Sequence, residues 1–478
     1  MIVAIRVWCC ASCLCALLPA AAYGEYEANW ASLDARPVPQ WWKDAKFGIF
    51  VHWGPYSVPA FAPTPRLYGS NWKDGKKIYS FYAEWYQGQL DRSNELVRAY
   101  HLQKYGSSPY ANFAAAFRAE NFNAAEWADL FRRAGARYAV LTAKHHDGYA
   151  LWPSAETPYY NSVALGSGRD LVGEFATAMK AAGLKRGFYY SLMEYANPNY
   201  PMKTREATPT PEQRERVRKW ARNVNIPQME ELVEKYGADI LWPDGEWYYS
   251  DRDYLSGEFL AWLYNESTTK DMVVVNDRWG SDSRGKHGGH LTTEYGAGPE
   301  CIDGANVRPW EECRGIGRSF GFNRMETSED YMTPEECIET LVDVASRGGN
   351  LLLNVGPTAD GRIPAIMQDR LLAMGRWLET NGEAIYGSTH YAKADRELAK
   401  KGVYFTERGN SVYVISMKWP EAPLRVTGLG SVDAVSLLGG DERISWCFDN
   451  DVLSLEPPPS RPKGQAYGWT FKIQRRKQ

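Results

Sequence analysis

The run LWPDGEW at residues 241–247 brings two carboxylates and two tryptophans close together. The preceding residues EKYGADI indicate the end of a helix and the start of a buried strand, so Asp244 is expected where that strand passes into a loop. In a barrel of parallel strands, catalytic groups collect at this rim. A carboxylate there could stabilise the cationic transition state of glycoside cleavage, and the tryptophans could provide the flat apolar wall that a sugar ring contacts.

Five of the seven histidines lie in runs that are expected at strand ends: His52 in FVHWG, His145 and His146 in AKHHDG, and His287 and His290 in HGGH. For any single histidine, the sequence favours an ordinary structural role and a functional role equally. A metal site is a second alternative, but adjacent side chains along a strand point to opposite faces. That objection weakens at a strand end. We favour recognition of sugar hydroxyls, because imidazole, like a hydroxyl, both donates and accepts hydrogen bonds.

Alternating strand and helix patterns cover roughly residues 45–380. Apolar runs favour strands in FGIFVHW, YAVLTAKHH, LKRGFYYSL, ADILWPDG, MVVVNDRW and NLLLNVGP. Capping residues and apolar periodicity predict helices after Asn123, Asp170, Thr210 and Thr333, with further helices near 255–265 and 364–380. This pattern predicts an α/β fold with a TIM-like (β/α) barrel. A doubly wound open sheet is disfavoured, because no glycine-rich phosphate turn follows the first strand.

From about residue 390 the pattern changes to short alternating runs separated by Gly, Asn and Pro. These runs predict a C-terminal antiparallel β-sandwich domain. Residues 280–330 are glycine-rich and polar and show no clear order. The expected organisation is therefore a signal peptide over 1–23, a catalytic barrel over 24–388 and a sandwich over 389–478.

The N-terminus has the pattern of a secretory signal, because Arg6 precedes the apolar run VWCCASCLCALLPAAA and small residues follow up to Gly24. The run is short for a membrane span and no second one follows, so no membrane insertion is expected. Asn265 begins a glycosylation sequon. The net charge of −3 gives no reason to expect nucleic acid as a partner.

Four cysteines would remain after removal of the signal, and they could form disulfides in an oxidising compartment. Their pairing cannot be read from the sequence. A zinc site is disfavoured, because these cysteines lack a C-x-x-C spacing. The four are Cys301, Cys313, Cys337 and Cys447.

The chain resembles the α-L-fucosidases of glycoside hydrolase family 29 over about residues 28–390. The similar motifs include WWKDAKFGIFVHWGPYSVPAF, YAEWY, YAVLTAKHHDGYALWPS, GFYYSLMEY, DILWPDGEW, VVVNDRWG, HGGH and GGNLLLNVGPTADG, in the order of the family. The resemblance implies a retaining exo-hydrolase that removes terminal α-L-fucose from glycoproteins, glycolipids or oligosaccharides. It implies no metal and no organic cofactor, and many relatives associate, so a homo-oligomer is possible. The N-terminal signal is shared by lysosomal and secreted proteins, and one of these two locations is expected.

The resemblance also implies roles for particular residues. Asp244 matches the family's nucleophile, which forms a covalent fucosyl-enzyme. Glu246 is expected to support the loop. Tyr189 and its neighbour Tyr190 are alternative matches to one position, and we favour Tyr189. The positions that match the family's fucose pocket are His52, Glu84, Trp85, His145, His146, Tyr189, Trp242 and Arg278.

The acid/base is not named by a motif, because the family places it in a variable loop after the NDRW strand. Glu294 in HLTTEYG is the first choice, and Glu311 in RPWEECRG is the second. The chemistry requires a carboxyl about 5–5.5 Å from the nucleophile. Two other functions remain open: a non-catalytic fucose-binding protein, and another retaining glycosidase such as an α-galactosidase.

Overall fold

The computed structural model describes most of the chain after its N-terminal segment. The described residues are 26–70, 72–73, 76–77, 80–92, 94–195, 197–202, 207–296, 308–462 and 464–476. The expected signal peptide over 1–23 and Cys301 lie outside them.

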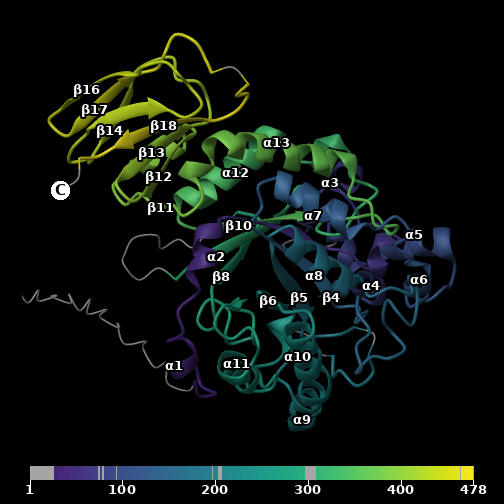
Figure 1. Cartoon of the computed structure of the whole chain (residues 1–478). Coiled ribbons are helices and arrows are strands. Elements are labelled where there is room, and N and C mark those ends of the chain that lie inside the picture. The colour runs from purple at the N-terminus through teal and green to yellow at the C-terminus, as the bar shows by residue number, and fades with distance from the viewer. Residues whose placement is uncertain are drawn as a thin grey trace, which may run out of the picture.

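Eight parallel strands form the centre of the larger domain (Figure 1). Around the sheet the order is β7-β6-β5-β4-β1-β10-β9-β8, which follows the chain from strand to strand. An isolated parallel bridge between Asn276 and His290 joins the two ends of this order, so the strands form a closed ring. The strands are β1 (Phe47–Val51), β4 (Tyr138–Lys144), β5 (Lys185–Ser191), β6 (Ile240–Asp244), β7 (Val274–Val275), β8 (Leu291–Glu294), β9 (Trp310–Gly315) and β10 (Asn350–Val355).

Helices cover the outside of this ring, as the prediction of a TIM-like barrel requires (Figure 1). No helix occurs between β7 and β8, or in the described residues between β8 and β9. The longer helices are α5 (Glu95–Tyr105), α7 (Ala124–Arg133), α8 (Leu171–Ala181), α9 (Pro211–Trp220), α10 (Ile226–Glu234), α11 (Ser256–Asn265), α12 (Pro334–Ser346) and α13 (Ala365–Asn381). The shorter ones are α1 (Trp30–Leu33), α2 (Gln40–Ala45), α3 (Pro65–Tyr68), α4 (Tyr86–Asp91), α6 (Asn112–Ala116) and α14 (Arg396–Ala399).

The predicted caps start these helices. The Asn123 side chain accepts hydrogen bonds from the first turn of α7, and Thr333 forms a capping box with Glu336 at the start of α12. Thr210 does the same for α9. A π-helical segment, η3 (Ala221–Asn225), joins α9 to α10 just before Pro227.

The C-terminal domain contains two antiparallel sheets, as predicted (Figure 1). One has the order β11-β12-β13-β18-β15 and the other β14-β17-β16, with an apolar core of their own. The Tyr404 hydroxyl donates a hydrogen bond to Glu339 of α12, which ties the sandwich to the barrel domain. The strands are β11 (Thr389–His390), β12 (Val403–Arg408), β13 (Ser411–Ser416), β14 (Leu424–Thr427), β15 (Ala434–Leu437), β16 (Ser445–Asp449), β17 (Val452–Glu456) and β18 (Trp469–Gln474).

The fold bears on the expectations about the cysteines, the glycosylation sequon and membrane insertion. Cys313 and Cys337 are buried and Cys447 is exposed, and all three are free thiols. The Asn265 side chain is already paired with the backbone N–H and C=O of Tyr26 at 2.8 Å each, so the amide that would carry a glycan is engaged in the folded chain. None of the helices in the described part of the chain has the length and apolar composition of a membrane span.

Candidate active site

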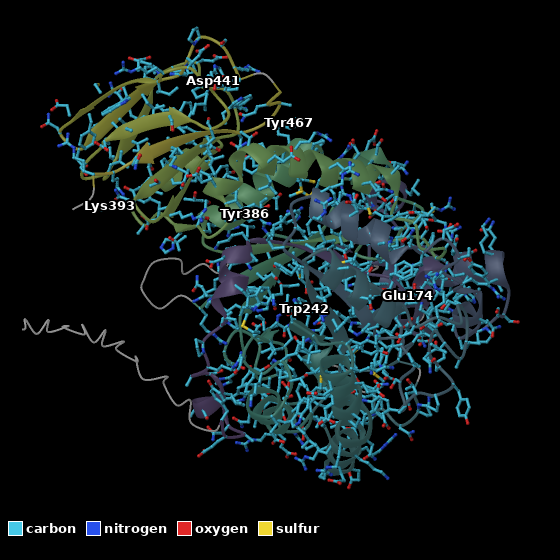
Figure 2. The ribbon with its side chains drawn as sticks, in the orientation of Figure 1. Glu174, Trp242, Tyr386, Lys393, Asp441 and Tyr467 are labelled. Atoms are coloured by element: carbon cyan, nitrogen blue, oxygen red, sulfur yellow. The ribbon has the colours of Figure 1, made fainter. Side chains whose placement is uncertain are left out.

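The carboxyl ends of the barrel strands bring most of the expected site residues together. His52 follows β1, His145 and His146 follow β4, and Asp244 and Glu294 end β6 and β8. These positions are far apart in sequence, and the closed ring of strands is what gathers them. Trp242, labelled in the larger domain in Figure 2, is buried in a cluster with inward-facing side chains of the barrel strands.

Asp244 is buried and held by three neighbours. The Tyr189 hydroxyl donates to Oδ2 at 2.8 Å, Arg278 Nη1 donates to Oδ1 at 2.7 Å, and His146 Nε2 lies 3.6 Å from Oδ2. Burial alone raises the pKa of Asp244, but the charges of Arg278 and His146 and the hydrogen bonds from Arg278 and Tyr189 outweigh it and hold the pKa well below its usual range. The carboxyl group is therefore ionised at neutral pH, as a nucleophile must be.

Arg278 connects Asp244 to Glu294. Its second terminal nitrogen, Nη2, donates to Glu294 Oε1 at 2.6 Å, and its Nε donates to Thr292 at 2.9 Å. The guanidinium lies over the Trp242 ring, 4.4 Å from the centroid, which adds a cation–π contact. One buried arginine thus joins the two carboxylates that the sequence singles out.

Successive side chains of β5 point to opposite faces of the sheet. This alternation separates Tyr189 from Tyr190, the two alternative matches to one site position. Tyr189 faces the barrel interior, where it reaches Asp244 and stacks on Trp242 with centroids 5.7 Å apart. Tyr190 faces the outer helices, and its hydroxyl contacts Asn225 and Gln228. Only Tyr189 can therefore touch a group bound at Asp244.

Tyr189→Phe is expected to lower kcat/KM by about 10- to 100-fold, because it removes a hydrogen bond to a charged oxygen. The matched control is Tyr190→Phe, one position along the same strand. It should lower the free energy of unfolding by about 1–3 kcal/mol while changing kcat/KM far less. Steady-state kinetics and thermal unfolding of both variants check this pair. The reverse pattern would assign the contact to Tyr190.

The three rim histidines are buried. Burial is the main reason that the pKa of His52 is lowered to about 3 and that of His145 falls well below its usual range. Both rings are therefore neutral at pH 7. His52 Nδ1 lies 2.7 Å from the Asn354 side chain, whereas His145 Nδ1 has no hydrogen-bond partner among the described residues. Neutral imidazoles with an open nitrogen suit hydroxyl groups.

Glu84 and Trp85 come from a different part of the chain, the short helix η2 (Ala83–Trp85). Glu84 Oε2 accepts from Gly321 N at 2.8 Å and from Ser319 at 3.2 Å, while its buried Oε1 has no partner among the described residues. Burial raises the pKa of Glu84 to about 7. The Trp85 ring meets His146 edge to face at 5.2 Å, so this helix contributes to one wall of the site.

Glu311 lies deeper in the barrel. It occupies the second position of β9, where Tyr138 donates to Oε2 at 2.6 Å and Trp242 Nε1 donates to Oε1 at 2.9 Å. Glu294 pairs in register with Cys313, two residues further along β9. Both oxygens of Glu311 are thus occupied beneath the floor formed by Trp242, whereas Glu294 lies at the rim.

Several residues of the site carry no clear signal in the sequence. Phe320 packs against His52, with centroids 4.9 Å apart, and Tyr295 packs against both Phe320 and Tyr82. Phe320 and Tyr295 lie in the stretch that shows no order in the sequence, whereas Tyr82 is the first residue of the YAEWY motif and precedes η2. His287 and His290 do not join the other histidines: His287 pairs with Asp34, and His290 stacks on Trp42.

Within the described residues, no group of three or more His, Cys, Asp or Glu side chains is arranged to hold a metal ion. The chemistry that the arrangement offers is that of two carboxylates joined by one arginine. Neutral imidazoles, a protonatable Glu84 and aromatic rings surround them. This combination suits a small polar ring compound that reacts with a carboxylate.

Comparisons with known proteins agree with this geometry. The family model described as "Alpha-L-fucosidase" matches residues 13–383, and the model "Alpha-L-fucosidase C-terminal domain" matches residues 396–474. The tissue alpha-L-fucosidase of Rattus norvegicus is 39% identical over 455 residues, which cover 94% of this chain and 92% of that protein. The plasma alpha-L-fucosidase of Homo sapiens is 37% identical, with 92% and 90% covered.

Among solved structures, the Thermotoga maritima alpha-fucosidase in complex with fucose superposes with a TM-score of 0.76 at 35% identity. The match covers 94% of this chain and 100% of that chain. Barrel and sandwich are thus both shared with that enzyme.

Proposed function

This chain belongs to the α-L-fucosidase family of glycoside hydrolases, and on that premise we propose that it is a retaining exo-α-L-fucosidase. Its substrates would be glycoproteins, glycolipids or oligosaccharides that end in α-L-fucose. The reaction would proceed by double displacement through a covalent fucosyl-enzyme.

In the first step, an Asp244 oxygen forms a bond to C1 of fucose while the bond from C1 to the glycosidic oxygen breaks. The electron pair goes to that oxygen, which takes the proton of Glu294. In the second step a water molecule loses a proton to Glu294 and attacks C1, and Asp244 leaves as a carboxylate. Glu294 is then protonated again and the cycle closes.

One observation carries this proposal: a single guanidinium, that of Arg278, contacts Asp244 at 2.7 Å and Glu294 at 2.6 Å. A guanidinium that donates hydrogen bonds to both carboxyl groups is consistent with the short separation of the two carboxyls, about 5–5.5 Å, that a retaining mechanism uses. Glu311 offers no such geometry, because Tyr138 and Trp242 occupy it beneath the site. Glu294 is therefore the acid/base that we propose.

The remaining groups would hold the sugar. The open nitrogen of His145 and the open oxygen of Glu84 are buried polar atoms that lack partners among the described residues, and fucose hydroxyls would supply those partners. Burial raises the pKa of Glu84 to about 7, so this carboxyl can also donate a hydrogen bond near neutral pH. His52, His146, Tyr189 and the rings of Trp85 and Trp242 complete the pocket.

We also propose that residues 1–23 direct the chain into the secretory pathway, with a lysosomal or secreted destination. The catalytic domain would then run over 24–388 and the sandwich over 389–478. Relatives of the family often associate, so a homo-oligomer is part of this proposal. Its partner is the fucosylated glycan itself.

The stereochemical course tests the proposal directly. Wild-type protein should release L-fucose from an aryl α-L-fucoside, and NMR should show α-L-fucose as the first product, before mutarotation. First appearance of the β-anomer would rule out double displacement. Faster release of galactose from the matching galactoside would assign the site to another retaining glycosidase, and binding of fucose without turnover would leave a binding protein.

A further inference from the structure

A chain of alternating charges extends from Asp244 beyond Glu294. Arg284 lies on the other side of Glu294, with its Nη2 3.7 Å from Glu294 Oε1, and its Nη1 lies 3.5 Å from Glu246 Oε1. Arg278 donates to the same Glu294 oxygen, Oε1. Both guanidiniums therefore face Oε1 of Glu294, and among the contacts of the described residues Oε2 is the oxygen left for a proton.

Arg284 lies on the long connection between β7 and β8, and this connection is firmly anchored. Asp277 Oδ2 accepts from Gly285 N at 2.9 Å, and Asp277 Oδ1 accepts from Thr292 at 2.7 Å. One carboxylate thus ties the residue after Arg284 to the strand that carries Glu294. The backbone next to Arg284 is therefore held in place relative to β8.

Glu246 holds the other end of the chain. Its side chain is 1% exposed, and its Oε2 has no hydrogen-bond partner among the described residues. It lies on η4 (Glu246–Tyr248), two residues after Asp244, where Gly245 adopts a φ of 78°. Burial first, and then the charge of Asp244, raise the pKa of Glu246 to about 7.

We propose that Arg284 and Glu246 form a positioning pair for the acid/base, which holds Glu294 by Oε1 and directs Oε2 toward the glycosidic oxygen. This inference rests on the proposed function of Glu294. Arg284 would act through Glu294 and not on the sugar, and Glu246 would share the charge of Arg284 when it is ionised. The role of Glu246 therefore extends beyond the loop support expected from the sequence.

Several charged or titratable groups lie near Glu294 and Glu246. Besides Arg284, those near Glu294 are Arg278, Glu84, Tyr82 and Cys313, and those near Glu246 are Asp244, Arg278 and Tyr254. Among the described residues, only Arg284 forms ion pairs with both Glu294 and Glu246 and none with the nucleophile. Its removal therefore perturbs the acid/base without touching Asp244.

The test compares two leaving groups. Arg284→Met should lower kcat/KM about tenfold or more on an α-L-fucosyl disaccharide, whose leaving group needs a proton. On 2,4-dinitrophenyl α-L-fucoside, whose leaving group needs none, the loss should be much smaller. The alkaline limb of the disaccharide profile should move to higher pH, because Arg284→Met removes a positive charge 3.7 Å from the proposed acid/base.

Glu246→Gln should move the same limb to lower pH. Above about pH 7 the wild-type Glu246 is ionised and shares Arg284, whereas the glutamine leaves that charge to Glu294 alone. Opposite shifts in the two variants are a signature that a merely structural role would not produce. Arg284→Lys, which keeps the charge, should restore the position of the limb.

Lys286→Met is the matched control, because it removes an exposed positive charge from the same connection. It should keep the wild-type ratio between the two substrates. Equal losses on both substrates in Arg284→Met with an unmoved pH profile would overturn the proposal, and so would a change in KM alone. Failure of wild-type protein to cleave the dinitrophenyl fucoside would instead overturn the proposed function.

Discussion

Asp244→Asn is expected to lose about a thousandfold or more of kcat on aryl α-L-fucosides, the scale seen when a nucleophile that works together with its partners is removed. The amide has nearly the shape of the carboxylate, but it carries no charge and cannot attack C1. Arg278 keeps its second carboxylate partner, Glu294, so the variant should fold. Steady-state kinetics and thermal unfolding measure the two effects separately.

Asp253→Asn provides a matched control for this variant. Asp253 is also a buried aspartate in the connection after β6, but it pairs with Arg214 at 2.6 Å and Arg218 at 3.1 Å, away from the site. Its variant should lose stability and keep most of its kcat, because breaking buried pairs costs folding energy. Equal kinetic losses in the two variants would mean that Asp244 matters only for folding.

A fluorinated fucosyl reagent should trap the covalent intermediate and identify the attacking oxygen. In wild-type protein the label should lie on the peptide that contains Asp244, and mass spectrometry should show one fucosyl group per chain. Asp244→Asn should remain unlabelled. A label on Glu246 or Glu294 would assign the nucleophile to another carboxylate of the same cluster.

The barrel could be predicted because the sequences of its strands and of the helices between them follow simple patterns. Strands such as FGIFVHW are buried on both sides and therefore read as apolar runs, and capped amphipathic helices separate them. β8 and β9 could not be seen in this way. Their inward-facing positions carry polar groups of the site and its floor, such as Thr292, Glu294 and Glu311, so the apolar run that marks a barrel strand is missing.

The site itself was only partly predictable, for a similar reason. Motifs place Asp244 and the histidines at strand ends, but the direction of a side chain depends on the parity of its strand. Tyr189 and Tyr190 differ only in this parity, and β5 settles it by pointing one to Asp244 and the other to Asn225. Phe320 reaches His52, and Glu84 reaches Gly321, only through the folded connections, and no local pattern encodes these contacts.

Glu294→Ala is the second variant with a large expected effect. Loss of the general acid should cost about 10²- to 10⁴-fold in kcat/KM on fucosyl disaccharides, because their leaving groups depart poorly without a proton. A dinitrophenyl fucoside should still transfer fucose to Asp244, since its leaving group needs no proton. The second step, which needs a base, should then limit turnover, and the fucosyl-enzyme should accumulate.

Azide separates the two carboxylates that the sequence leaves as candidates. It is a small nucleophile that needs no general base, so it should restore turnover of Glu294→Ala and yield α-L-fucosyl azide, with the configuration retained. Glu311→Gln should show no such rescue. Its carboxylate accepts from Tyr138 and Trp242 beneath the site, so the substitution should mainly lower the free energy of unfolding.

The different outcomes expected for Glu294 and Glu311 follow from whether each carboxyl group can deliver a proton to the glycosidic oxygen. Glu294 is partly exposed at the rim, and Arg278 holds its Oε1, which leaves Oε2 as the oxygen for a proton among the contacts of the described residues. Glu311 is fully buried with both oxygens engaged, so it has no route to a glycosidic oxygen above Trp242. Azide rescue of a Glu311 variant would require the barrel floor to open, and would reassign the acid/base to that residue.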